Sequence, residues 1–90
     1  MSGNLGSLAA ALAGAVHSIE AAQSSCSITI GRGGDALQRL AAVTDGSRND
    51  NIAQAYGALA FAADNIEQAI ANYVLAKDKV LAFAAERGLG

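Results

Sequence analysis

The clearest pattern lies in the second half of the chain, where apolar residues recur at alternating steps of four and three. The series runs through positions 52, 56, 59, 63, 66, 70, 73, 77, 80 and 84, the spacing of a seam between two packed helices. Its one charged member, Lys77, can pack its stem and leave its ammonium in water. Residues 47–51 offer N-caps and Gly88 a C-terminal stop. We therefore predict one helix over about residues 51–87, roughly 54 Å long.

The first half carries a helical pattern that fades before the middle of the chain. Its larger apolar side chains recur at steps of three and four, and Asn4 precedes them as an N-cap candidate; they are Leu5, Leu8, Leu12, Val16 and Ile19. From Ser24 to Ile30 polar and apolar residues alternate instead. A single short strand would have no partner, so we interpret this segment as a distorted helix end. The first helical piece is therefore predicted over about residues 5–30.

Glycines follow that segment and predict a break in the first arm. Gly31, Gly33 and Gly34 favour a helix stop. Asp35 followed by Gln38 resembles a capping box, which opens a second, shorter helix over about residues 36–44.

A roughly 54 Å helix needs a partner that runs alongside it, because a compact protein of this size is too small to cover it. The two pieces of the first arm together are nearly long enough, and the turn signal over residues 45–50 joins them to the long helix. We therefore predict an all-α, antiparallel helical hairpin with a broken first arm, forming a single domain over residues 1–90.

The composition indicates that such a hairpin does not stand alone. Of the 90 residues, 52% are hydrophobic, but 22 are Ala and another 10 are Gly, so few large side chains remain for a core. A lone cysteine, Cys26, excludes an internal disulfide, and a lone histidine, His17, leaves no ligand set for zinc. Association with another chain is the remaining stabiliser. We therefore predict a four-helix bundle made by pairing with a second hairpin, of the same or a different chain.

A straight helical wheel assigns faces to the long helix. It places Val74 and Leu81 with the inner residues and places Phe61, Leu75 and Phe83 on the opposite side. We predict that these last three residues form an interface with a partner protein. Leu8 and Leu12 of the first arm are the other interface candidates.

Several classes of function are disfavoured. The net charge of −2 and the scattered Lys and Arg leave no basic face for nucleic acid. The longest nearly apolar stretch, residues 8–16, is far shorter than the about 20 residues of a membrane span. The Gly31–Gly34 segment lacks a Walker sequence, and His17 with Glu20 reads as a surface pair, so we predict no enzyme, metal or cofactor. No basic residue precedes Arg32, so we expect a cytoplasmic protein or one exported without a cleaved leader.

The whole pattern, an acidic, Ala-rich chain with two long arms joined near its middle, resembles the helical-hairpin proteins of actinobacterial type VII secretion, the Trp-x-Gly family and toxin-associated partners. This chain has residues 44–49 (Thr-Asp-Gly-Ser-Arg-Asn) where the family has Trp-x-Gly. Lys77 stands four residues after Tyr73, where the family's secretion signal has an acidic residue, and Asp78 comes one position later. No functional residue is therefore carried over.

The resemblance implies a dimeric four-helix bundle that serves as a secretion partner or targeting adaptor, with a toxin encoded nearby as one candidate partner. Two alternatives remain open. One is a cytoplasmic immunity or regulatory protein that binds and inhibits a single partner, and the other is a structural subunit of a helical assembly.

Overall fold

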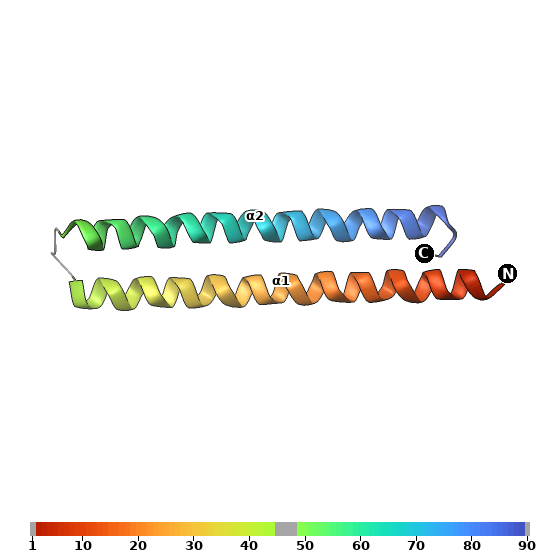
Figure 1. Cartoon of the computed structure of the whole chain (residues 1–90), viewed down its shortest axis with the longest axis horizontal. Coiled ribbons are helices and arrows are strands. Elements are labelled where there is room, and N and C mark those ends of the chain that lie inside the picture. The colour runs from red at the N-terminus through yellow and green to blue at the C-terminus, as the bar shows by residue number, and fades with distance from the viewer. Residues whose placement is uncertain (1, 45–48, 90) are drawn as a thin grey trace.

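The computed structural model describes residues 2–44 and 49–89, and its secondary structure there consists of two α-helices. Helix α1 spans Ser2–Thr44 and helix α2 spans Asp50–Glu86. The helices lie antiparallel and side by side, so the start of α1 and the end of α2 lie at the same end of the rod (Figure 1). The rod measures 68 × 16 × 15 Å. The predicted all-α helical hairpin is confirmed, while the predicted turn at residues 45–50 falls mostly outside the described residues.

Local signals at both ends of α2 explain its bounds. The side-chain Oδ1 of Asn49 accepts a hydrogen bond from the backbone N–H of Asn51 at 2.8 Å, an N-cap. At the other end Gly88 adopts a φ of 74°, and the N–H of Leu89 donates to the carbonyl of Ala84 at 2.8 Å. That bond and the one from Gly88 to Ala85 form a Schellman motif. The predicted start and stop of the long helix are therefore correct to within one residue.

The predicted break in the first arm is wrong. Helix α1 continues through Gly31, Gly33 and Gly34 without interruption. The helix begins at Ser2, so Asn4 lies inside it rather than ahead of it. Asp35 does not open a new helix but lies within α1, where its Oδ2 accepts a hydrogen bond from Nε of Arg39 one turn later at 3.0 Å.

The segment read as a distorted helix end is also regular helix. Within it the hydroxyl of Thr29 donates a hydrogen bond to the backbone carbonyl of Ser25 at 2.9 Å. Each glycine in a helix costs about 0.5–1 kcal/mol relative to alanine, and contact with α2 along the whole arm offsets that cost. Helical continuity in α1 is therefore a consequence of tertiary pairing.

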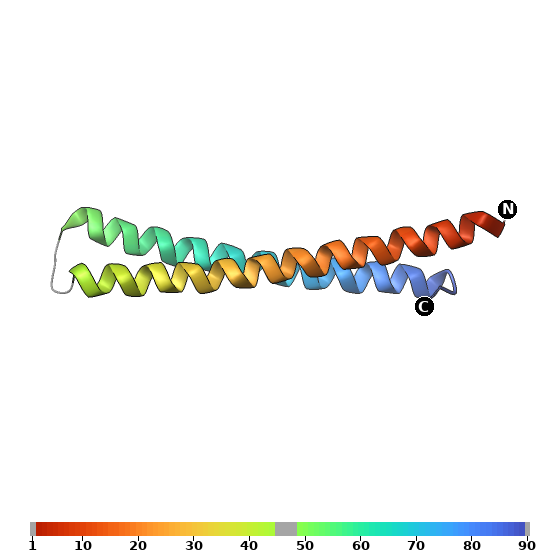
Figure 2. The ribbon, with the colours of Figure 1, turned by 90° about the horizontal axis from the view of Figure 1, so that it is seen from below.

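Both helices contribute a seam of half-buried residues. In α2 all ten positions of the predicted heptad series are half-buried, which confirms the predicted seam. In α1 the matching half-buried series runs through positions 8, 12, 15, 19, 22, 26, 30, 33, 37 and 40. The α1 series has two consecutive steps of four, from 22 to 26 and from 26 to 30, whereas the α2 series alternates steps of four and three throughout. The two helices cross near the middle of the rod when it is viewed from below (Figure 2), as helices packed through such seams do.

The seam is not a closed core. Among the described residues none is buried, and the chain exposes 6442 Å². A compact protein of this mass would expose about 4,900 Å². The radius of gyration is 20.0 Å, against about 12 Å for a compact chain of this length. The hairpin therefore leaves more surface in water than a globular fold would, and seven large hydrophobic side chains of the described residues are exposed on it.

Candidate interaction surface

The structure separates the five predicted interface residues into two groups. Phe61 and Leu75 are 62% and 54% exposed, as expected for residues that face away from α1. Leu8 and Leu12 are half-buried in the seam, so they stabilise the hairpin. Phe83 is half-buried as well, so its predicted place on the fully outer side is wrong.

Two residues predicted inside lie outside. Val74 and Leu81 are 42% and 48% exposed. A straight helical wheel drifts by about 20° per heptad relative to a seam with a 3.5-residue period. The drift adds up along α2. On the straight wheel Val74 and Leu81 point the same way as the seam residues of the first turns, but by the last turns the seam itself points in another direction. The heptad series, rather than the straight wheel, identifies which side chains meet α1.

These corrections define an apolar surface on the outer side of α2, which we call the outer strip. Its large members are Phe61, Val74, Leu75 and Leu81, all exposed. Exposed alanines at positions 60, 71, 82 and 85 fill the spaces between them, and the strip also carries four polar side chains, Asp64, Glu67, Gln68 and Asp78. The strip covers the sector of α2 formed by three adjacent heptad columns. Large apolar side chains thus lie along both edges of the strip, and Asp64 and Asp78 lie between them. Apolar side chains gathered on one exposed side of a helix are typical of a protein–protein contact.

A different sector of α2 is polar. It carries the exposed residues Ala58, Asn65, Asn72, Lys79 and Glu86, spaced seven apart. Only one of the five is apolar, and it is small. Helix α2 therefore has one side for α1, one apolar side without a described partner, and one side suited to water.

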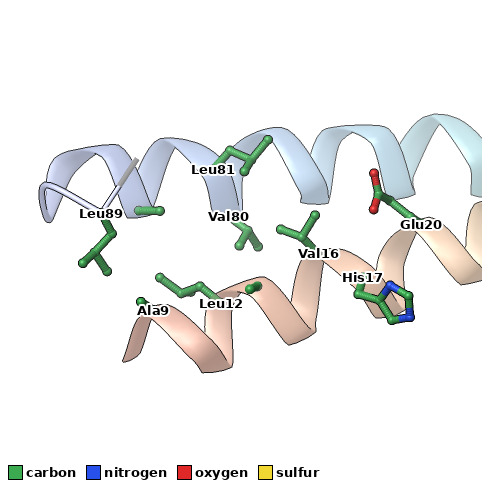
Figure 3. A pocket seen from close by; sticks show the side chains of 10 residues that line it. Ala9, Leu12, Val16, His17, Glu20, Val80, Leu81 and Leu89 are labelled. Carbon is green, nitrogen blue, oxygen red and sulfur yellow. The ribbon is translucent and has the colours of Figure 1, made fainter. Parts of the chain in front are cut away.

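At the open end of the hairpin the outer strip continues into a groove between the helices. Its volume is about 380 Å³ and its walls come mostly from aliphatic side chains, among them Leu12, Val16, Val80, Leu81 and Leu89. Figure 3 shows Val80 and Leu89 directed toward the α1 side of the groove. The Schellman motif at Gly88 turns Leu89 back over this groove. Leu81 belongs to both the groove and the outer strip, so the two form one apolar surface.

One ion pair joins the helices beside that groove. Nζ of Lys77 donates to Oε2 of Glu20 at 2.9 Å. The hydrogen bond and the charge of Lys77 lower the pKa of the Glu20 carboxyl, partial desolvation raises it slightly, and nearby His17 adds a smaller lowering effect. A second groove of about 470 Å³ begins at this pair and is about as polar as it is apolar, lined by Gln23, Ser24 and Ser27 with Ile28. The apolar groove therefore stops at the Glu20–Lys77 pair, whereas the outer strip continues past it to Phe61.

The other candidate chemical features are the metal-ligating side chains, the thiol and the glycine segment. Within residues 2–44 and 49–89 no three His, Cys, Asp or Glu side chains come together as a candidate metal site. Cys26 is a half-buried free thiol on the seam. The Gly31–Gly34 segment is helical, so its backbone N–H groups are used within the helix rather than offered to a phosphate.

Helix α1 is more continuous, and therefore longer as an apolar helix, than its sequence pattern indicated. Within the described chain it is the helix that is long and apolar enough to cross a membrane, over Leu5–Val43, where an 18-residue window has a mean hydropathy of 1.3 and no buried residue. Length and composition alone support this, and a helix that packs against protein passes the same criterion. The expectation of no membrane span therefore stays a prediction.

Comparison with known proteins adds no relative: no family model, curated protein or solved structure matches this chain.

Proposed function

We propose that this chain is a protein-interaction module that completes its fold by forming a four-helix bundle with a second helical hairpin. In that form it acts as a secretion partner or targeting adaptor of a type VII-like system. The observation that carries the proposal is a 68 Å hairpin in which no described residue is buried. The apolar surface that a core would cover is available to another protein.

The magnitude of the exposed area supports association over independent function. The hairpin exposes about 1,500 Å² more than a compact chain of its mass. At about 25 cal/mol per Å² of apolar surface, covering one third of this excess with apolar contacts contributes about 12 kcal/mol before entropic costs. A chain with so thin an interior gains more from a partner than from any rearrangement of its own. The adaptor role itself is supported by the resemblance to leaderless helical-hairpin proteins.

The test is the mass of the assembly in solution, measured by light scattering for the chain alone and with the product of the adjacent gene. A closed dimer, or a 1:1 complex with that product, is expected. Loss of an enzymatic activity of the bound partner would favour the immunity alternative, and open polymers would favour the structural subunit. A folded monomer in both samples would overturn the proposal.

Melting gives an independent test of the same idea. The stability of an obligate dimer depends on protomer concentration, so the melting temperature should fall by several degrees on hundredfold dilution. A cooperative transition at the same temperature throughout the dilution series would contradict an associating fold.

Vesicle flotation distinguishes two explanations for the apolar length of α1, packing against protein and insertion into a membrane. If α1 pairs with protein, the purified chain stays in the soluble fraction with neutral and with anionic lipid vesicles. Flotation with both kinds of vesicle would assign the apolar length of α1 to the bilayer and contradict the bundle.

A further inference from the structure

We propose that residues 24–34 of α1, which we call the joint, form a hinge at which α1 opens locally from α2. In the structure α1 is continuous, which is the closed state (Figure 1). In the open state the joint leaves the helical conformation, and residues 35–44 form a separate helix that begins at Asp35. The inference concerns the hairpin itself and does not rest on the proposed function. Four features carry it: the helix preference of the joint, its glycines, its part of the seam, and the hydrogen bonds at its end.

The joint has a weak preference for helix. Its one strong helix former is Arg32, and its other residues are Ser, Thr, Cys, Ile and Gly. The ten residues that follow it, 35–44, include seven strong helix formers, which are Ala, Leu, Gln or Arg. A loss of contact with α2 therefore unwinds the joint before it unwinds residues 35–44.

The glycines of the joint are not required by packing in the closed state. An added Cβ at Gly31, Gly33 or Gly34 would meet nothing within 4 Å, and all three lie in regular helix. Glycine gains more backbone freedom on leaving a helix than any other residue. The three glycines therefore favour the open state and contribute nothing to the closed one.

The joint presents little apolar surface to α2. Its half-buried positions are Cys26, Ile30 and Gly33, of which only Ile30 has a large apolar side chain. The two consecutive steps of four, from 22 to 30, lie at the same place. Such an inserted step locally unwinds a pair of packed helices, whereas the α2 series has no matching irregularity. Contact with α2 thus holds the joint less firmly than it holds the leucines on either side.

The hydrogen bonds near the end of the joint fit a break ahead of Asp35. The hydroxyl of Thr29 donates to the carbonyl of Ser25 at 2.9 Å, a bond that slightly destabilises helices and often bends them. The bond between Asp35 and Arg39 lies wholly within residues 35–44, so it persists when the joint opens. Asp35 followed by Gln38 resembles a capping box, which a continuous helix leaves unused and a helix that begins at Asp35 would use.

Opening at the joint would uncover part of the α2 seam. The Glu20–Lys77 pair joins the helices four residues before Ser24, so it marks the limit of the opening. Measured from this pair, with the same rise in both helices, the joint lies at the level of about residues 63–73 of α2. Ile66 and Ile70 are half-buried there. The hinge therefore controls access to these two side chains while the groove at the other end of the rod stays as it is.

Backbone hydrogen exchange in the full chain tests the local opening. The amides of residues 31–35 donate to carbonyls within the joint, whereas those of Arg39 and Leu40 donate to carbonyls of residues 35 and 36. After correction for intrinsic rates, NMR should show the first group exchanging at least tenfold faster than the second. A helix that only frays from its end at Thr44 would give the reverse order. That order, or equal rates, would overturn the hinge.

Alanine substitutions test the role of the glycines with a matched control. Gly34→Ala should slow exchange of the joint amides about threefold, and the triple variant Gly31→Ala, Gly33→Ala, Gly34→Ala about 30-fold. Gly14→Ala makes the same change at another exposed, helical glycine of α1 with open space for a Cβ. It should change the joint rates less than twofold. Equal slowing by Gly14→Ala and Gly34→Ala would mean that the whole hairpin unfolds for exchange, which contradicts a local hinge.

Two substitutions of Asp35 test where the helix begins in the open state. Asn is a good N-cap residue but forms no ion pair with Arg39, whereas Ala supplies neither. The exchange rates of Arg39 and Leu40, divided by those of the joint amides, should therefore be about fivefold higher in Asp35→Ala than in Asp35→Asn. An equal ratio in the two variants would show that no helix begins at Asp35.

Discussion

The two helices of the rod pack against each other, but they differ in how strongly the sequence of each one favours a helix. Helix α2 has an uninterrupted heptad seam, an N-cap at Asn49 and a glycine stop at Gly88. Helix α1 carries three glycines between residues 31 and 34 and a seam with one irregular step. Both are nevertheless continuous. We therefore expect α2, which has the stronger local signals, to act as the template that keeps α1 helical.

This difference gives α1 a specific vulnerability. Its glycine-containing turns are helical because α2 lies alongside them, whereas most of α2 would keep its helical preference in any packing that covers its seam. Substitutions that remove the pairing should therefore affect α1 first and most.

The largest effect is expected from a charge on the α2 seam. Ile70→Asp puts a carboxylate at a half-buried position and should cost about 3 kcal/mol or more. Circular dichroism should report loss of helix well beyond the turns around residue 70, because α1 loses its template. The control Asn72→Asp, exposed two residues away, should retain full helicity. A loss of helix confined to α2 would show that α1 does not depend on α2 for its helical structure.

Next in size is the effect of the glycines. The triple variant Gly31→Ala, Gly33→Ala, Gly34→Ala should raise stability by about 2 kcal/mol in total. All three positions are helical, and an added Cβ would meet nothing within 4 Å. Thermal unfolding at a fixed protein concentration measures the gain. Destabilisation would mean that the first arm needs a bend there, as its sequence first indicated.

The same substitution should have the opposite sign at the end of α2. Gly88 has a φ of 74°, a region that costs an L-residue about 1–2 kcal/mol. Gly88→Ala should therefore destabilise the hairpin by about 1 kcal/mol and loosen Leu89 from the groove. Hydrogen exchange at the Leu89 amide, which donates to Ala84, provides the local measurement. An unchanged exchange rate would show that the Schellman motif does not hold Leu89.

The smallest effect concerns the ion pair that joins the helices. Lys77 lowers the pKa of Glu20 below its ordinary value of 4.5. The pair therefore contributes stability that is complete above pH 4.5 and is lost as the pH falls through the lowered pKa. Glu20→Gln should remove this component of acid sensitivity, measured as the pH dependence of unfolding. The local pair serves as the control: Asp35→Asn should cost only about 0.3 kcal/mol, and it should leave the pairing of α1 with α2 intact.

Much of the hairpin follows from the sequence because the deciding interactions are local. The heptad series of α2, the polar residues before it and Gly88 after it predict its course and bounds, since caps and seam periodicity act within a few residues. The exposure of Phe61 and Leu75 follows from the same periodicity. The scarcity of large side chains likewise predicts a chain without a closed interior.

Only the tertiary structure decided the rest. Contact along α2 keeps Gly31, Gly33 and Gly34 helical, an energy that no local pattern contains. The winding of two helices about each other moves the seam relative to a straight wheel, which exposes Val74 and Leu81 and half-buries Phe83. Pairing between distant segments thus sets both the continuity of α1 and the shape of the apolar surface, because each depends on where the second helix lies.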